Sequence, residues 1–286
     1  MGKEAIVVSG LRYYYGKTRA VDGIDFTVDA GEIFGFLGPN GAGKSTTIKM
    51  LTGMLAPREG SISIFDTDIA GGRDKVQGRI GVCFEEKNLY IELTAKENLE
   101  FFARLFGIQD FDALAPLERV GLAERAKERV KTYSKGMRQR LMVARSLINK
   151  PDVLFLDEPT DGLDPVSSRA IRKIVKEEAD RGAAVVLTTH DMNEADQLSD
   201  RVAFINEGKI VAIDSPENLK IAHGNRSVKI RTRSGDEIQE RSVALGSVEA
   251  GEALKIAAAD KNLMTIHTEE ATLEDIFVKI TGRGLI

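Results

Sequence analysis

The hydrophobic pattern of the chain alternates between two kinds of element up to about residue 214. Short runs made almost wholly of apolar residues are typical of strands that are buried on both faces. Such strands are expected at 33–37, 80–84, 153–156 and 184–189. Apolar residues at helical spacing lie between them, and Thr94-Ala95-Lys96-Glu97 is a capping box that starts one helix. This alternation predicts an α/β core with a mainly parallel sheet.

Other segments alternate apolar and polar residues, which indicates strands with one exposed face. They are expected at 6–8, 24–28 and 60–65, with a hairpin formed by 202–205 and 210–213. These strands predict an antiparallel β edge beside the parallel sheet. Residues from about 86 to 150 are interpreted as a helical subdomain, with a break near Pro116 and an amphipathic helix that includes Met137 and Leu141.

The pattern changes near Pro216, which we take as a domain boundary. Residues 1–215 are predicted to form the main domain, and residues 216–286 an accessory domain. The second part is interpreted as strand, turn at 234–236, strand, helix, strand and helix. It is therefore expected to be a small C-terminal α+β extension.

Composition limits the class of protein. The 286 residues suffice for one large domain and one small one, and a net charge of −4 does not favour a surface for polyanions. The single cysteine, Cys83, excludes a disulfide within the chain and fits a reducing compartment. No signal peptide is expected at the N-terminus, and no run of apolar residues is long enough to span a bilayer. If the protein works in transport, the pore is expected to come from another chain.

A glycine-rich segment between a predicted strand and a predicted helix fits the Walker A phosphate-binding pattern. Its residues are Gly38, Pro39, Asn40, Gly41, Ala42, Gly43, Lys44, Ser45 and Thr46. The backbone N–H groups of such a loop surround phosphate oxygens at a helix N-terminus. Lys44 is expected to reach the β- and γ-phosphates, and the Ser45 hydroxyl to bind Mg²⁺. The loop alone indicates only a nucleotide phosphate, because kinases, GTPases and ATPases share it.

Two carboxylates follow the buried strand at 153–156. In an open α/β sheet, ligands bind beyond the carboxyl ends of the parallel strands. Asp157 lies at such an end and is therefore placed to hold Mg²⁺ through water. Glu158 is one residue further and is a candidate general base for the attacking water. A solvated acidic pair would be the simpler interpretation of an isolated Asp-Glu. The all-apolar strand before the pair and Pro159 after it favour the functional one.

Further segments complete a pattern that resembles the ABC ATPase family. They are Asp157-Glu158-Pro159-Thr160, Gly162-Leu163-Asp164-Pro165, His190 after a buried strand, and Tyr133–Arg140, which is similar to the signature motif. The resemblance implies a P-loop ATPase core. It implies that Ser134 and Gly136 touch the γ-phosphate of ATP on the opposite subunit, and that Asp164 links the two sites. It also implies that His190 contacts the γ-phosphate and that Tyr15 stacks on adenine. Ser134 is in addition a suitable N-cap.

This chain departs from the majority of the family in its signature. Tyr133, Lys135 and Met137 stand where most members have Leu, Gly and Gln. This form is similar to that of a branch of single-domain exporter ATPases. The C-terminal segment 271–282 resembles the tail of exporter ATPases related to the daunorubicin and sodium exporters. The resemblance therefore implies export rather than import.

A second departure concerns the metal. The family places a Gln after the strand at 80–84, and this chain has Glu85 there. A carboxylate also binds Mg²⁺, so our hypothesis is that Glu85 replaces the Gln as a metal ligand. A solvated loop carboxylate is the alternative. In the family the following segment receives a helix of the membrane subunit, and we expect Leu89 and Tyr90 at that surface.

The leading interpretation is an ATP-binding subunit of an ABC transporter. It implies hydrolysis of ATP with Mg²⁺ in a head-to-tail homodimer or heterodimer, with Lys44, Glu158 and His190 as catalytic residues. The dimer would drive export through an integral membrane permease subunit at the cytoplasmic face of the cell membrane. A soluble ABC-type ATPase acting on ribosomes or DNA is the alternative. Such relatives usually carry two ATPase units or a long coiled-coil insertion, and no nucleic-acid partner is expected here. A GTPase or kinase leaves Ser134, Asp164 and His190 unexplained.

Overall fold

The computed structural model describes residues 3–84, 88–224, 227–234 and 237–282. The chain divides into two compact units, one up to Asp214 and the other from Ser215 to Gly284. Within the described ranges, no helix combines the length and the apolar character needed to cross a membrane.

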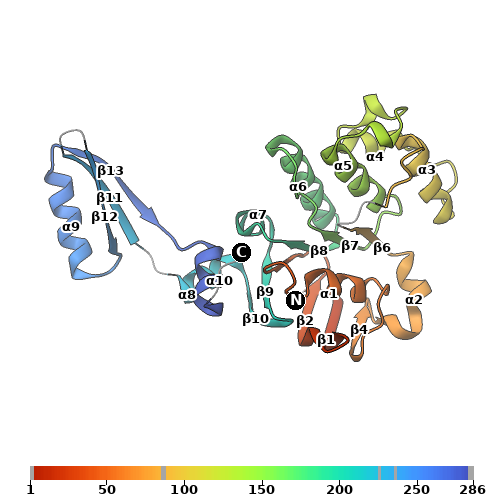
Figure 1. Cartoon of the computed structure of the whole chain (residues 1–286), viewed down its shortest axis with the longest axis horizontal. Helices are drawn as coiled ribbons and strands as arrows, with labels where there is room; N and C mark the ends of the chain where they lie inside the picture. Colours follow the sequence, from red (N-terminus) through yellow and green to blue (C-terminus); the bar gives the residue numbers. More distant parts are fainter. Residues whose placement is uncertain (1–2, 85–87, 225–226, 235–236, 283–286) are drawn as a thin grey trace. The chain divides into compact units, whose positions relative to one another are not determined.

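The centre of the first unit is a six-stranded sheet with the strand order β10-β9-β3-β8-β7-β6 (Figure 1). All neighbours in it are parallel except β9 and β10, which form an antiparallel hairpin. The expected mainly parallel sheet is therefore confirmed. Its strands are β3 (Ile33–Leu37), β6 (Ile80–Cys83), β7 (Val153–Asp157), β8 (Ala184–Thr189), β9 (Arg201–Asn206) and β10 (Lys209–Asp214).

The central strands are apolar at every position because each face of the sheet is covered. Phe155 of β7 points into a core shared with an antiparallel sheet, whereas Leu154 and Leu156 point into a core shared with helices. Successive side chains of a strand point to opposite faces, so one short run supplies both cores. The carboxyl end of β7 is held in place from both sides.

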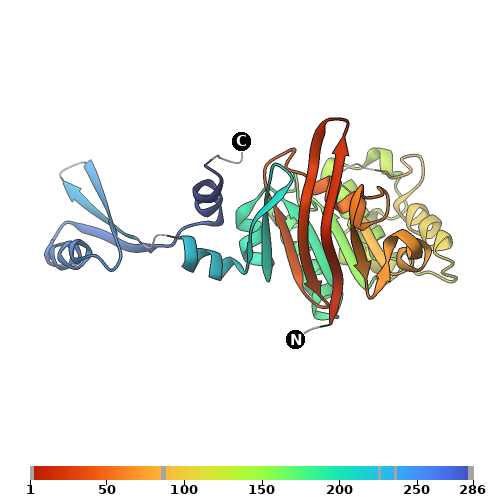
Figure 2. The same ribbon diagram turned by 90° about the horizontal axis from the view of Figure 1, so that it is seen from below.

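The antiparallel sheet has the order β2-β1-β4-β5. Its long strands β1 and β2 run side by side (Figure 2) and extend well beyond the short segments expected from the pattern. The bounds are β1 (Glu4–Tyr15), β2 (Thr18–Asp29), β4 (Glu59–Ile64) and β5 (Thr67–Asp68). Phe26 of β2 stacks on Phe34 of β3 with ring centroids 5.3 Å apart, which joins this sheet to the central one.

The helices of the first unit include the expected ones, and α2 (Ile69–Gln77) and α7 (Met192–Leu198) were not expected. The capping box is present, since the Thr94 side chain accepts from the Glu97 N–H and the Glu97 side chain from the Thr94 N–H. The helix break expected near Pro116 is present, since α3 ends at Leu105 and α4 begins at Leu114. Pro116 itself lies in the first turn of α4, where its missing N–H breaks no helical hydrogen bond. The helices are α1 (Lys44–Leu51), α2 (Ile69–Gln77), α3 (Ala95–Leu105), α4 (Leu114–Arg119), α5 (Lys135–Ser146), α6 (Pro165–Asp180) and α7 (Met192–Leu198), with short 3₁₀ turns at Ala123–Arg125 and Val130–Thr132.

The second unit has a three-stranded sheet with the order β12-β11-β13 and one helix on its apolar face. Val228, Ile230 and Val243 pack there against alanines of α9. The elements are α8 (Pro216–His223), β11 (Ser227–Ser234), β12 (Glu237–Ala244), α9 (Val248–Ala259), β13 (Leu263–Glu269) and α10 (Leu273–Thr281). Helix α8 was not expected, while the elements after it follow the expected order.

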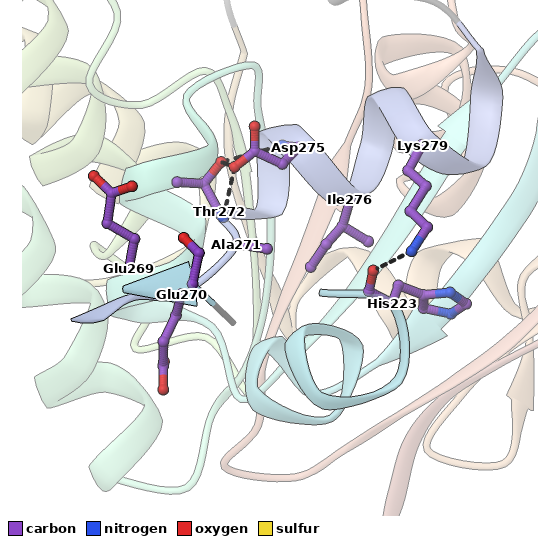
Figure 3. A pocket seen from close by; sticks show the side chains of 9 residues that line it. His223, Glu269, Glu270, Ala271, Thr272, Asp275, Ile276 and Lys279 are labelled. Carbon is purple, nitrogen blue, oxygen red and sulfur yellow. Dashed lines mark hydrogen bonds between the residues drawn. The ribbon is translucent and has the colours of Figure 1, made fainter. Parts of the chain in front are cut away.

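An open pocket of about 490 Å³ lies in the second unit beside the C-terminal end of α8 and helix α10 (Figure 3). The Lys279 ammonium donates to the His223 carbonyl oxygen at 2.8 Å, so α10 caps the C-terminal end of α8. Glu269, Glu270 and Asp275 also line this pocket. The Glu269 carboxylate is paired with the Lys229 ammonium at 2.8 Å, and the Asp275 carboxylate completes the capping box of α10.

Candidate functional site

The phosphate-loop segment connects β3 to α1, as its pattern predicts. Gly43 has φ 110° and stands at the N-cap of α1, and its carbonyl oxygen accepts from both the N–H and the hydroxyl of Thr47, each at 2.9 Å. The loop is also tied to the β9–β10 turn, because the Gly208 N–H donates to the Ala42 carbonyl oxygen at 3.0 Å. The loop backbone is therefore fixed at the C-terminal end of its glycine-rich part, by α1 and by the β9–β10 turn.

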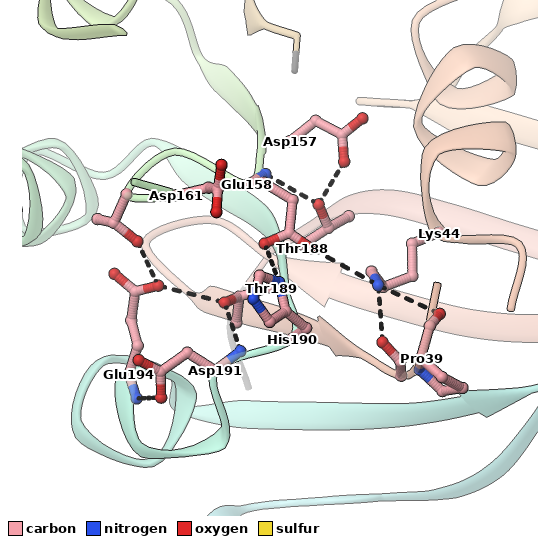
Figure 4. A network of polar contacts seen from close by, with 12 residues as sticks. Pro39, Lys44, Asp157, Glu158, Asp161, Thr188, Thr189, His190, Asp191 and Glu194 are labelled. Carbon is pink, nitrogen blue, oxygen red and sulfur yellow. Dashed lines mark hydrogen bonds and ion pairs between the residues drawn. The ribbon is translucent and has the colours of Figure 1, made fainter. Parts of the chain in front are cut away.

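The Lys44 side chain is buried and surrounded by oxygen atoms (Figure 4). Its ammonium donates to the carbonyl oxygen of Gly38 at 2.6 Å and to that of Pro39 at 3.4 Å. It also lies 3.6 Å from a carboxylate oxygen of Glu158. Residues from the ends of β3 and β7 thus meet at one cation, although β8 separates the two strands in the sheet.

Glu158 is held in an unusual backbone conformation directly after β7. Its φ of 50° lies in the left-handed region that non-glycine residues rarely adopt. The Glu158 N–H donates to both the carbonyl oxygen and the hydroxyl of Thr188, each at 3.1 Å. The same hydroxyl donates to the carboxylate of buried Asp157. Strand β8 therefore fixes the direction in which Glu158 leaves the sheet.

The Glu158 carboxylate contacts a histidine as well as the lysine. The His190 Nδ1 atom lies 2.9 Å from a Glu158 carboxylate oxygen (Figure 4). Burial raises the pKa of Glu158, and the nearby Lys44 ammonium and His190 act in the opposite direction. A carboxylate whose pKa is raised by burial, in contact with a histidine, is suited to accept a proton from water.

These groups face a pocket of about 580 Å³, a volume within the usual range for small-molecule sites. Its lining brings together most of the residues singled out from the sequence, namely Tyr15, Pro39, Asn40, Gly41, Gly43, Lys44, Ser45, Thr46, Glu158 and His190. Tyr15 at the end of β1 is half-exposed, and its ring meets that of buried Tyr13 edge-on at 4.9 Å. The Tyr15 ring is thus supported by the buried Tyr13 ring.

Several of the expected site residues do not line this pocket, and among the described residues they are Gly38, Ala42, Ser134, Gly136, Asp157 and Asp164. The Ser134 hydroxyl caps α5 by accepting from the Met137 N–H at 3.2 Å. The Asp164 carboxylate caps α6 by accepting from the N–H groups of Ser167 and Val166, each at 3.0 Å. Hydrogen bonding from the Ser167 side chain, together with these N–H groups, lowers the pKa of Asp164. Gly136 lies next to Leu163, whose methyl would be 3.2 Å from an added Cβ. Ser134, Gly136 and Asp164 therefore form a second surface around the start of α5.

The oxygen donors available for a cation are few. Ser45 lines the pocket, and Asp157 is buried at the end of β7. A hydroxyl and a carboxylate are the donor types that Mg²⁺ prefers, so the pair fits this ion. In the described part of the chain, no cluster of three or more His, Cys, Asp or Glu side chains could hold a metal. Glu85, the third expected ligand, lies outside the described residues.

Sequence reasoning missed several residues of the site. Thr188 and Thr189 were interpreted only as the end of a buried strand, yet the Thr188 hydroxyl joins Asp157 to the Glu158 backbone. Glu194 was not considered, although it is buried and accepts hydrogen bonds from two threonines. The available signal was that two polar residues end a strand that is otherwise apolar, at the edge of the sheet where ligands bind.

The partner surface expected at Leu89 and Tyr90 is wrong for Leu89 and stays a prediction for Tyr90. Leu89 is buried in the core around the helices, so it is not available to a partner. Tyr90 is 48% exposed, and its ring meets that of Phe101 edge-on at 4.9 Å. A separate pocket of about 300 Å³ lies nearby, with Phe102 and Arg145 in its lining.

Comparison with known proteins gives consistent matches. The family model described as ABC transporter matches residues 21–161. A fluoroquinolones export ATP-binding protein of Mycobacterium tuberculosis is 47% identical over 288 residues, which cover 100% of this chain and 96% of that protein. The daunorubicin/doxorubicin resistance ATP-binding protein of Streptomyces peucetius is 43% identical over an alignment that covers 79% of this chain and 70% of that protein. A solved ATP-binding subunit of an ABC transporter matches with a TM-score of 0.71 at 30% identity, over 76% of this chain and 92% of that one.

Proposed function

The chain belongs to the ATP-binding subunits of ABC transporters, and from this premise we propose how its residues bind and hydrolyse ATP to drive export. The observation that carries the proposal is the convergence of Lys44, Glu158 and His190 on one pocket beside the phosphate loop. Within that pocket, Tyr15 is assigned to the adenine ring, and the loop N–H groups to the phosphates.

The hydrolytic step is assigned to Glu158 and His190. A water oxygen attacks the γ-phosphorus, the bond from that phosphorus to the β–γ bridging oxygen breaks, and ADP leaves with inorganic phosphate. The Glu158 carboxylate takes the proton of the attacking water. His190, 2.9 Å from Glu158, orients the water and contacts the γ-phosphate. Lys44 compensates the negative charge on the phosphate oxygens.

Mg²⁺ is proposed as the metal of this site. Ser45 and Asp157 are the described residues that would hold it, and the hypothesis that Glu85 adds a third ligand stands unchanged. When bound, the ion would neutralise charge on the β- and γ-phosphate oxygens. The chain's own share is to present the two oxygen donors and to keep Asp157 in place through the Thr188 hydroxyl.

Two copies of the ATPase subunit are proposed to form a head-to-tail dimer, as a homodimer or with a related chain. The placement of Ser134 and Gly136 away from the phosphate loop of the same chain supports this arrangement. The N-terminus of α5, capped by Ser134, would then point its positive end at the ATP of the other subunit. Asp164, at the start of α6, would connect the two sites.

The membrane partner is proposed to be an integral permease, which places the subunit at the cytoplasmic face of the cell membrane. Tyr90 is the described residue that we assign to this contact, and the buried Leu89 is no longer part of it. No nucleic-acid partner is proposed.

The test is the Glu158→Gln variant in the full chain, assayed for release of inorganic phosphate from ATP. It is expected to bind ATP, to form a stable ATP-bound dimer in size-exclusion chromatography, and to release at least about a hundredfold less phosphate than the wild type. Asp180→Asn, an acid-to-amide change at the far end of α6, is the control. Turnover of Glu158→Gln at the control's level would refute the assignment of the base.

A further inference from the structure

We propose that Glu194 is a positioning residue, which holds the loop after Glu158 and the strand end before His190 in one fixed arrangement. The inference rests on the function proposed above and adds a residue to it. Glu194 lies in the first turn of α7, outside every motif singled out in the sequence. It does not line the pocket that holds the phosphate loop.

The contacts of Glu194 join two segments that are far apart along the chain. One of its carboxylate oxygens accepts from the Thr160 hydroxyl at 2.7 Å and from the Thr189 hydroxyl at 3.3 Å. Thr160 follows Glu158 by two residues, and Thr189 directly precedes His190. A single oxygen atom therefore connects the two segments that carry the catalytic pair (Figure 4).

The position of Glu194 is itself fixed from its own helix. The Asp191 carboxylate caps α7 by accepting from the N–H groups of Asn193 at 2.9 Å and Glu194 at 3.1 Å. The Asp191 N–H in turn donates to the Thr189 hydroxyl oxygen at 3.0 Å. The Thr189 hydroxyl therefore accepts one hydrogen bond from Asp191 and donates one to Glu194, so the direction of each bond is determined.

Burying a carboxylate is energetically unfavourable unless hydrogen bonds replace those that it made with water. Only 4% of Glu194 is exposed, and it has no ion pair within 4 Å among the described residues. Burial raises its pKa, and the hydrogen bonds from Thr160 and Thr189 act in the opposite direction. A buried acceptor that holds two hydroxyls has a structural task, because an unsatisfied hydroxyl in the same place would be unfavourable.

The catalytic pair needs such support. Glu158 has a left-handed backbone conformation, which persists only where the surroundings impose it. Strand β8 holds the start of this loop through Thr188, whereas Glu194 holds it two residues further on. Glu194 also lines a cavity of about 360 Å³ together with Glu158 and His190, so the three side chains lie around one space.

The experiment measures ATP hydrolysis by the full chain assembled with its membrane partner. Glu194→Ala is expected to lower kcat on the order of tenfold to a hundredfold, with KM for ATP changed less than about threefold, since the base is misplaced and the phosphate loop is not. Glu194→Gln keeps an oxygen acceptor for both hydroxyls and is expected to recover kcat to within about threefold of the wild type. Asn193→Ala, an exposed neighbour on α7, is the matched control.

A double-mutant cycle separates positioning from a general loss of stability. Thr160→Val alone is expected to lower kcat severalfold, and to have no further effect in the Glu194→Ala background, because the hydroxyl acts through that carboxylate. A kcat of Glu194→Ala equal to that of Asn193→Ala, or independent effects of the two changes, would overturn the proposal. A wild type without ATPase activity would instead refute the proposed function, so the two failures are distinguishable.

Discussion

Gly43→Ala tests how the phosphate loop is held. The added Cβ would lie 2.3 Å from the Ala20 carbonyl oxygen of β2 and 3.3 Å from the Ile205 side chain of β9. Both neighbours belong to sheets, so the clash with the backbone oxygen is not relieved by a side-chain rotation. The φ of 110° at this position is a second cost, because residues with a Cβ rarely adopt it. The loop in the variant must therefore move away from β2.

The cost of this change falls on nucleotide binding. A backbone conformation of this kind costs about 1–3 kcal/mol for a non-glycine residue. The variant must return to this conformation, and so must meet this cost, to place its N–H groups around the phosphates. ATP affinity is therefore expected to fall about 5- to 150-fold. Titration with a fluorescent ATP analogue measures it, and thermal unfolding shows whether the fold is kept. Gly71→Ala, which meets no atom within 4 Å, is the control. Equal affinity of Gly43→Ala and the control would refute the reasoning.

Three other predictions follow from the same structure. Gly81→Ala places a Cβ 2.0 Å from the Ser146 carbonyl oxygen, so calorimetry is expected to show a loss of about 1–3 kcal/mol, whereas Gly78→Ala in open space is close to neutral. Burial raises the pKa of Glu158, so its base form is lost on acidification at a pH above the ordinary 4.5, and a pH–rate profile with its acid limb at or below that value would contradict this. Tyr15→Ala is expected to weaken ATP binding by about 1–3 kcal/mol and Tyr15→Phe hardly at all, as measured by calorimetric titration.

The central sheet and the phosphate loop could be predicted because local signals agree with the tertiary structure there. The apolar runs at 33–37 and 184–189 correspond to β3 and β8 residue for residue. Because both faces of these strands are buried, the runs are apolar apart from the two threonines that end β8, and the pattern is easy to recognise. The break expected near Pro116 lies just before the proline, between Leu105 and Leu114. Its exact place could not be predicted, since a proline is compatible with the first turn of a helix and the pattern alone does not locate that turn.

Contacts that depend on tertiary structure were beyond the sequence. Helix α8 has a Ser215 cap and a proline at its first position, which are start signals, but Pro216 was interpreted as a boundary only. Lys44 meets Glu158 because the strands have the order β3-β8-β7 in the sheet. The hydrophobic periodicity of the sequence predicts the strands and does not predict their order. The role proposed for Glu194 depends on the direction in which α7 leaves β8.

The contacts of Lys44 have a further consequence for nucleotide affinity. Its ammonium is already shared among two backbone carbonyl oxygens and the Glu158 carboxylate. Binding of ATP is therefore an exchange, in which phosphate oxygens compete with oxygens of the protein for one cation. Removing the carboxylate as a competitor, as in Glu158→Gln, shifts this exchange towards the nucleotide before hydrolysis is considered. Retention of ATP by that variant would then have two separable origins, tighter capture and slower chemistry.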